Sequence, residues 1–281
     1  MALRQLKRIL PAFSDPIGDL QTVRPLPSPQ IDVLDPFLFL NHHGPQIYAK
    51  KNQGLPFGPH PHRGFQTVTF IVEGDIAHKD SAGHESVIER GGAQWMSAGK
   101  GLIHEEVSSD NFKLHGGPLE ILQLWVNLPA KDKFSAPYYK GLQQQEIPHI
   151  KSDDGQVQVQ VIAGLFAAQA GAFQPSTDLT VLMLHMKGDG VIQLQIPGLR
   201  QIFFYVVRGS LQVNGVTVNK MNLVEFTTAG QQINVSATTD SLVLVCHAVP
   251  YNEPIVSSGP FVMNTTEEIR QAYADYQAGR F

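Results

Sequence analysis

The chain has 281 residues, of which 42% are hydrophobic and 16% are charged. This length and apolar content suit one large or two ordinary domains with packed cores, and they exclude an intrinsically disordered chain. The formal net charge of −4 provides no general attraction to nucleic acid or to an anionic membrane surface. No stretch approaches the roughly twenty apolar residues of a membrane-spanning helix, so we expect no nucleic-acid or membrane partner.

The N-terminus and the single cysteine favour a cytoplasmic protein. Residues 1–10 are partly basic but lack an apolar segment followed by a small-residue cleavage site, so no secretory signal is predicted. Cys246 is the only cysteine, which makes an intramolecular disulfide impossible. The apolar run around it predicts a buried strand thiol.

Short runs rich in β-branched and aromatic residues follow one another along the chain, with glycine and proline between them. Such frequent short strands are typical of β-sandwiches and β-barrels, so we expect an all-β protein. The clearest predicted strands are residues 67–72, 121–126, 157–162, 179–186, 191–196, 202–207, 211–213 and 242–247. One helix is predicted near the end, over 265–276, where a capping Thr265 precedes an acidic first turn.

An internal repeat divides the chain into two similar β domains. Residues 70–75 resemble residues 205–210, and residues 94–99 resemble residues 225–230. In both copies one strand ends at a glycine turn and a later strand ends in Ala-Gly. We therefore predict two domains in tandem, 1–135 and 136–281.

The strongest chemical signal is two pairs of potential metal ligands in the first copy. His60 and His62 flank a proline, and His104 and Glu106 stand two residues apart in 99–106. Residues two apart on a strand point to the same face, so each pair can direct two ligands inward. Nitrogen and oxygen donors without thiolate suit Fe(II), Mn(II), Ni(II), Cu(II) or Zn(II). Four such ligands leave positions open on a five- or six-coordinate ion, which indicates a catalytic site.

Other titratable residues are weaker candidates. Glu105 is the direct rival of Glu106, but strand alternation turns it away from the face that His104 uses. His78 and His84 bracket a glycine-containing turn, and we expect them to form loop hydrogen bonds. The remaining histidines lack a suitable paired partner and are expected to be structural: His42, His43, His115, His149, His185 and His247.

The second copy lacks the four ligands. The residues that align with them are, in order, Gln195, Pro197, Val235 and Ala237. The N-terminal domain is therefore expected to perform the chemistry, and the C-terminal domain to supply packing, a wall or a partner surface.

Several segments form an ordered set of motifs along nearly the whole chain: residues 59–65, 83–84, 94–106, 123–128 and 259–265. Together they resemble the pirin family of the cupin superfamily. The resemblance implies a bicupin of two jelly-roll-like β-barrel domains, with one mononuclear metal, commonly iron, in the N-terminal barrel. It also assigns the ligands to His60, His62, His104 and Glu106. Gln66 departs from the family pattern, in which this position is usually Glu, and this difference strengthens Glu106 as the carboxylate ligand.

Some pirins are similar to flavonol dioxygenases, which cleave the heterocyclic ring of quercetin with O2 and release carbon monoxide. The resemblance therefore implies a metal-dependent dioxygenase with a flavonol-like or other small aromatic substrate, in which Glu106 is also the catalytic base. Iron is the expected metal, with Mn, Ni, Cu or Zn as alternatives. Candidate wall residues are Phe65, Trp95, Met96 and Trp125. Arg63 either forms part of the mouth or pairs with an acid, and Lys100 is expected in a solvated turn.

Two other functions remain open at this point. A redox-dependent regulator would use Fe(II)/Fe(III) exchange to bias a surface loop and alter a transcription or metabolic partner protein. An isomerase or other non-redox cupin chemistry would use similar ligands. An enzyme of the first kind consumes O2 with a flavonol, whereas a regulator only binds metal and partner. We expect a monomer.

Overall fold

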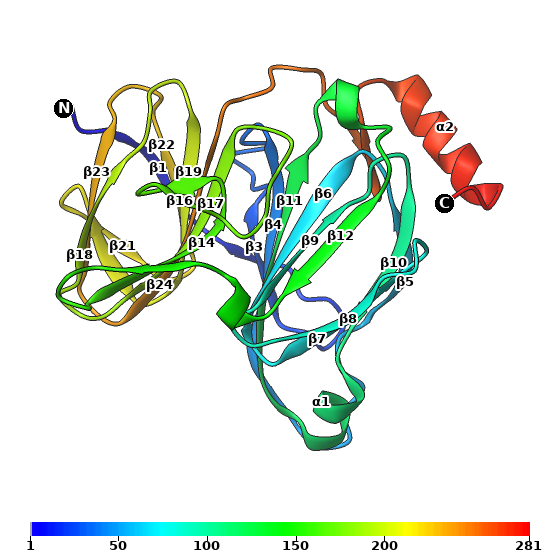
Figure 1. Cartoon of the computed structure of the whole chain (residues 1–281), viewed down its shortest axis with the longest axis horizontal. Coiled ribbons are helices and arrows are strands. Elements are labelled where there is room, and N and C mark those ends of the chain that lie inside the picture. Colours follow the sequence, from blue (N-terminus) through cyan, green and yellow to red (C-terminus); the bar gives the residue numbers. More distant parts are fainter. Residues whose placement is uncertain (1) are drawn as a thin grey trace. The chain divides into compact units, whose positions relative to one another are not determined.

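The computed structural model describes residues 2–281, which form two compact units (Figure 1). Unit 1 comprises the chain up to Phe13, Ser28–Asp35 and Gln145–Pro250, and unit 2 comprises Ser14–Pro27, Pro36–Gln144 and Tyr251–Phe281. The N-terminal segment thus belongs to the unit formed mainly by the second half of the chain, and the C-terminal segment belongs to the unit formed mainly by the first half. The predicted boundary between residues 135 and 136 does not include this exchange, because long-range strand pairing and ion pairs cannot be read from local sequence.

Unit 2 is built from two antiparallel sheets. Its seven-stranded sheet has the order β12 (Tyr138–Leu142), β9 (Ala93–Ser97), β6 (Phe65–Glu73), β11 (Gly117–Asn127), β4 (Phe37–Tyr48), β3 (Thr22–Leu26) and β2 (Phe13–Ser14). Its four-stranded sheet has the order β5 (Phe57–His62), β10 (Leu102–Val107), β7 (Asp75–Asp80) and β8 (Glu85–Glu89). Buried apolar side chains such as Ile71, Ile88 and Ile121 pack in the interior of this unit.

Unit 1 repeats the same strand order. Its larger sheet runs β1 (Leu6–Pro11), β22 (Asn222–Phe226), β19 (Gln201–Arg208), β24 (Ser241–Ala248), β17 (Leu179–Met186), β14 (Val157–Ala163) and β13 (His149–Lys151). Its smaller sheet runs β18 (Val191–Gln195), β23 (Gln232–Ala237), β20 (Ser210–Val213) and β21 (Val216–Asn219). The predicted fold of two cupin domains is confirmed, although in each unit the strands form two separate sheets and not one closed barrel.

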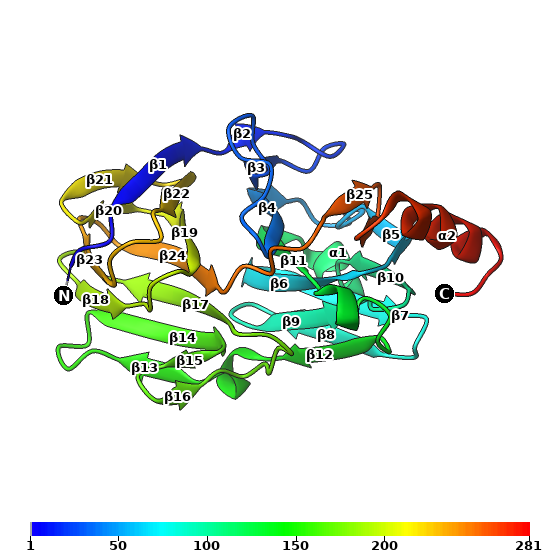
Figure 2. The ribbon, with the colours of Figure 1, turned by 90° about the horizontal axis from the view of Figure 1, so that it is seen from above.

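The smaller elements complete the two units. In unit 1, β15 (Leu165–Phe166) pairs with β16 (Gln169–Ala170). In unit 2, β25 (Val256–Ser258) pairs with β26 (Phe261–Met263), and Figure 2 shows α2 (Thr266–Gln277) beside β25. Two 3₁₀ turns lie at η1 (Ala130–Asp132) and η2 (Gln144–Glu146). No helix between residues 2 and 281 is both long and apolar enough to cross a membrane.

Local sequence explains both α-helices. The predicted C-terminal helix is confirmed as α2, whose Thr265 and Glu268 form a capping box with reciprocal side-chain to backbone hydrogen bonds. The short helix α1 (Asp110–His115) was not predicted. Its signal is the N-cap Ser109, whose hydroxyl accepts from the backbone N–H of Phe112.

The C-terminal segment is fastened to unit 2 next to the first ligand pair. The Arg63 guanidinium donates to Asp275 on α2 at 2.8 Å and to the carbonyl of Lys100 at 2.6 Å. The Lys133 ammonium is completely buried and donates to the carbonyls of Gly64 and Val262 at 2.8 and 2.9 Å. The sequence left the role of Arg63 open between the mouth and an ion pair, and the structure shows the ion pair.

Candidate metal centre

Three histidines of unit 2 converge where β5 meets β10. His60 and His104 are direct cross-strand partners, and the ring centroids of His60, His62 and His104 are 4.4 to 4.9 Å apart. One ring nitrogen from each lies within 4.8 Å of the others, as a shared ion requires. The convergence that strand alternation predicts for these three histidines is therefore present.

The hydrogen bonds of these rings suit metal binding. Nδ1 of His60 lies 2.7 Å from the carbonyl of Gly58, and Nδ1 of His62 lies 3.3 Å from the carbonyl of Pro260. A carbonyl accepts from the Nδ1–H tautomer, which leaves Nε2 as the nitrogen with a lone pair. His104 is 1% exposed, and neither of its ring nitrogens has a hydrogen-bond partner. A buried imidazole without partners is costly unless a ligand satisfies it, so these three residues fit a metal ion.

The surroundings keep the histidines in the form that binds metals. Burial lowers the pKa of His62 to about 3, and the neighbouring His60 adds to the effect. Burial also places the pKa of His104 well below its ordinary value, with further lowering from His62 and His60. Because only neutral imidazole offers a lone pair, no proton has to leave these two rings before metal binds at neutral pH.

Glu106 lies close by, but its carboxylate is held by neighbouring polar side chains. Its Oε1 accepts from the Thr69 hydroxyl at 3.1 Å and from the Gln94 amide, and its Oε2 accepts from the Gln123 amide at 2.5 Å. Burial raises the pKa of Glu106 to about 7, and the three hydrogen bonds act in the opposite direction. One carboxylate oxygen lies within 4.8 Å of a ring nitrogen of His104 and of His78. Glu106 does not belong to the cluster that His104 forms with His60 and His62.

His78 was not predicted as a ligand, but it faces the centre. It lies on β7 directly opposite Glu106 of β10, and its ring stacks on Tyr139 with 3.9 Å between centroids. Its Nε2 is 3.1 Å from Asp80, and its Nδ1 is buried without a hydrogen-bond partner. His78 therefore belongs with His104 and Glu106 to a second possible ligand set.

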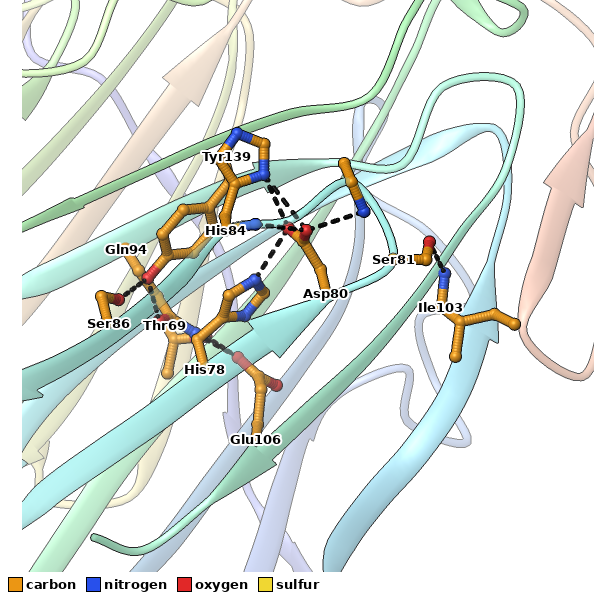
Figure 3. Close-up of polar contacts among 11 residues, drawn as sticks. Thr69, His78, Asp80, Ser81, His84, Ser86, Gln94, Ile103, Glu106 and Tyr139 are labelled. Atoms are coloured by element: carbon orange, nitrogen blue, oxygen red, sulfur yellow. Dashed lines mark hydrogen bonds and ion pairs between the residues drawn. The ribbon is translucent and has the colours of Figure 1, made fainter.

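Asp80 links His78 to His84, as Figure 3 shows. Its Oδ1 accepts from the backbone N–H groups of Ala82 and His84 at 3.0 Å each, and His84 Nδ1 lies 3.0 Å from its Oδ2. The hydrogen bonds expected for His84 are present in this turn. The strand position of His78 could have been found from the same-face spacing of His78 and Asp80.

The other residues considered in the sequence lie outside the candidate metal centre. Glu105 is partly exposed while its neighbours His104 and Glu106 are buried, as strand alternation requires. Gln66 accepts a hydrogen bond from the Trp95 indole at 2.9 Å. It is three residues from Thr69 on β6, so its side chain points away from the sheet face on which Thr69 contacts Glu106. Other histidines bond elsewhere: His42 to Glu120, His43 to Thr22, His115 to Asn111 and His247 to Arg200.

Aromatic side chains form a half-open wall beside His62. Trp125 stacks on Phe39 with 4.6 Å between centroids, packs against Phe65 at 4.4 Å and meets His62 edge-on at 5.4 Å. Phe39 and Trp125 are partly exposed, whereas Phe65 is buried. Met96 instead packs in a small core cluster with Ala98 and Leu102. The wall offers a flat apolar surface next to the candidate ligands.

Comparison with known proteins agrees with this fold and motif set. Residues 19–126 match Pirin, and residues 181–281 match the Pirin C-terminal cupin domain. The chain belongs to the pirin family. Among curated pirin relatives, a Caulobacter vibrioides pirin-like protein is 38% identical over 95% of each chain. A Pseudomonas aeruginosa protein named "putative quercetin 2,3-dioxygenase" is 37% identical over 88% of this chain and 87% of its own.

A solved structure gives the same result for the pirin fold. The crystal structure of a protein named quercetin 2,3-dioxygenase from Acinetobacter baumannii superposes with a TM-score of 0.93. The two proteins share 33% identity, and the superposition covers 100% of this chain and 99% of the other. The match includes both cupin domains.

Proposed function

We propose that this pirin binds one divalent metal ion, with iron as the first choice, through His60, His62, His104 and Glu106. The observation that carries this assignment is the buried His104, whose two ring nitrogens have no hydrogen-bond partner while two further imidazoles face it. The imidazole and carboxylate donors suit Fe(II), and Mn, Ni, Cu and Zn remain chemically possible.

We further propose that the pirin is a flavonol 2,3-dioxygenase. Support comes from the names of its similar relatives and from the aromatic wall of Phe39, Phe65 and Trp125 beside His62. A metal ion bound at the histidines would supply Lewis acidity toward the flavonol 3-hydroxyl and one-electron chemistry toward O2. The overall reaction takes up one O2 and releases one carbon monoxide for each flavonol cleaved.

The residues of this chain would contribute orientation and proton transfer. Stacking on Trp125 would hold the flat ring system beside His62, and the partly exposed Phe39 would extend that surface. Glu106 would accept the 3-hydroxyl proton on a carboxylate oxygen, after exchanging a hydrogen bond from Gln94 or Gln123. Gln94 donates to this carboxylate and accepts from the Tyr139 hydroxyl at 2.9 Å, which fixes the orientation of the Gln94 amide beside Glu106.

The test is oxygen uptake by anaerobically iron-loaded protein with quercetin, with carbon monoxide measured in parallel. Wild type is expected to consume O2 and release carbon monoxide in equal amounts, and H62A is expected to lose both. H115A is the matched control, because His115 is an exposed histidine on α1. Iron-loaded wild type that consumes no O2 with quercetin would refute the dioxygenase proposal. No described residue specifically supports the regulator or isomerase alternatives.

A further inference from the structure

Unit 1 contains a cavity of about 510 Å³ that the metal chemistry does not use. It opens where β17, β18 and β24 come together, and its volume is in the range of small-molecule sites. The polar lining consists of Asp178, Thr180, Gln193, Gln195, Arg200 and His247. The rest is apolar and includes Phe166, Leu182 and Ile196.

This cavity is the counterpart of the metal centre in the repeated fold. Gly74 and Gly209 end equivalent strands, both with positive φ, and Arg200 precedes Gly209 by as many residues as Phe65 precedes Gly74. His247 pairs with Ile202 as Trp125 pairs with Thr67. Arg200 and His247 therefore replace the aromatic pair Phe65 and Trp125.

The same strand registers show which residues of unit 1 correspond to the four candidate ligands of unit 2. Gln195 and Pro197, which line the cavity, stand where His60 and His62 stand in unit 2. Val235 pairs with Val213 as Glu106 pairs with His78, so Val235 corresponds to Glu106 and Ile233 to His104. This differs by two residues from the alignment made on sequence, in which Val235 corresponds to His104 and Ala237 to Glu106. At the positions of the four candidate ligands unit 1 has Gln195, Pro197, Ile233 and Val235, and its cavity contains the buried guanidinium of Arg200.

The Arg200 side chain connects the polar groups at one end of the cavity. It is 6% exposed, and its Nε donates to His247 Nδ1 at 2.8 Å. An imidazole that accepts at Nδ1 carries its proton on Nε2, so His247 offers an N–H donor there. The two terminal nitrogens of Arg200 donate to the Asp178 carboxylate at 2.6 and 2.9 Å.

The buried charges around this end are mainly positive. Arg4 is completely buried and donates to the carbonyls of Pro197 and Arg200, which fixes the loop behind the cavity. Arg200 and Arg4 both help to lower the pKa of His247 to about 3, after the larger effect of burial. The balancing carboxylate, Asp178, has a side chain that is 70% exposed. A buried cation with its counter-ion in solvent is well suited to a second, buried anion.

We propose that the unit 1 cavity is a binding site for a small organic acid with an apolar body. Its carboxylate replaces Asp178 on Arg200 and accepts from His247 Nε2–H, while Asp178 turns into solvent. Its body lies against Phe166, Leu182 and Ile196. The site requires no metal and is independent of the dioxygenase proposal.

The experiment is isothermal titration calorimetry of the full chain with 3-phenylpropanoate and octanoate, and with uncharged 3-phenylpropanamide as the matched probe. Wild type is expected to bind at least one acid about tenfold or more tightly than the amide, because a charge-assisted hydrogen bond to Arg200 distinguishes them. D178N is expected to tighten acid binding several-fold, since the competing carboxylate is gone. D153N makes the same charge change at an exposed position of unit 1 and is expected to have no effect.

Two further variants locate the site. Q195W places a large ring at the exposed cavity wall and is expected to abolish acid binding without loss of the folded state, as checked by circular dichroism. H62A in unit 2 is expected to leave acid binding unchanged. The proposal is overturned if neither acid binds, if acid and amide bind equally, if D178N weakens acid binding, or if H62A abolishes binding while Q195W does not.

Discussion

The buried Lys133 ammonium provides a stringent test of how the C-terminal segment is attached to unit 2. It follows the 3₁₀ turn Ala130–Asp132 and donates to Gly64 O, Asn127 Oδ1 and Val262 O at 2.7 to 2.9 Å. Burial lowers its pKa to about 8, so it is mainly charged at pH 7. Three hydrogen bonds from a charged donor are worth about 1.5–3 kcal/mol each before the cost of burying the charge.

K133M removes the donor and leaves three acceptors around a thioether of similar length. We expect the free energy of unfolding to fall by about 3–5 kcal/mol, because breaking a buried charged network leaves its partners unsatisfied. K131M is the matched control: Lys131 is exposed in the same turn, and its replacement is expected to change stability by less than about 0.5 kcal/mol. The assay is urea unfolding at pH 7 followed by circular dichroism. A loss below about 1 kcal/mol in K133M would refute this account of the attachment.

Three other substitutions test separate features. G64A is expected to cost several-fold more stability than G83A. Both glycines have positive φ, but a Cβ at position 64 would clash with the carbonyl oxygen of Val262, whereas a Cβ at position 83 would meet open space. Equal melting temperatures of the two variants would contradict this. Burial lowers the pKa of His43 to about 3, so the unfolded state binds more protons than the folded state between pH 6.5 and 3, and stability is lost as pH falls. Between pH 7 and 5 the free energy of unfolding of H43Q should therefore fall by about 1–2 kcal/mol less than that of wild type in urea titrations. Identical pH dependence of the two proteins would exclude this role of His43. W125L is expected to raise KM for quercetin about tenfold with little change in kcat, and an unchanged KM in steady-state assays would remove Trp125 from the substrate surface.

Much of the fold can be predicted because its information is local. The predicted strands 67–72, 179–186 and 242–247 lie within β6, β17 and β24, and Thr265 with its acidic first turn starts α2. The repeat also holds, because glycine turns at 74 and 209 end equivalent strands with positive φ. Helix α1 was missed because its six residues are too few to show helical periodicity.

The candidate site is predictable only where two candidate ligands share a strand. His60 with His62, and His104 with Glu106, show their same-face spacing in the sequence. His78 reaches the centre from a third strand, so its proximity to Glu106 depends on the register of β7 with β10. The attachment of α2 through Arg63 and Asp275 joins residues far apart in the chain, so no local sequence pattern predicts it.

The cavity of unit 1 shows the same limit. Arg200 directly precedes β19 and His247 lies on β24, so no local motif in the sequence joins them. Their contact at 2.8 Å depends on the pairing of β19 with β24. The absence of the candidate ligands from the second copy is visible in the sequence, whereas the polar cavity is visible only in the structure.

The most direct test of the central claim is the iron content of reconstituted protein, measured by inductively coupled plasma mass spectrometry after removal of unbound metal. The account predicts one iron per chain in wild type and in the exposed-histidine control H115A, and little or no iron in H104A. It would be contradicted by H104A that is folded and retains one iron per chain, or by wild type that binds none.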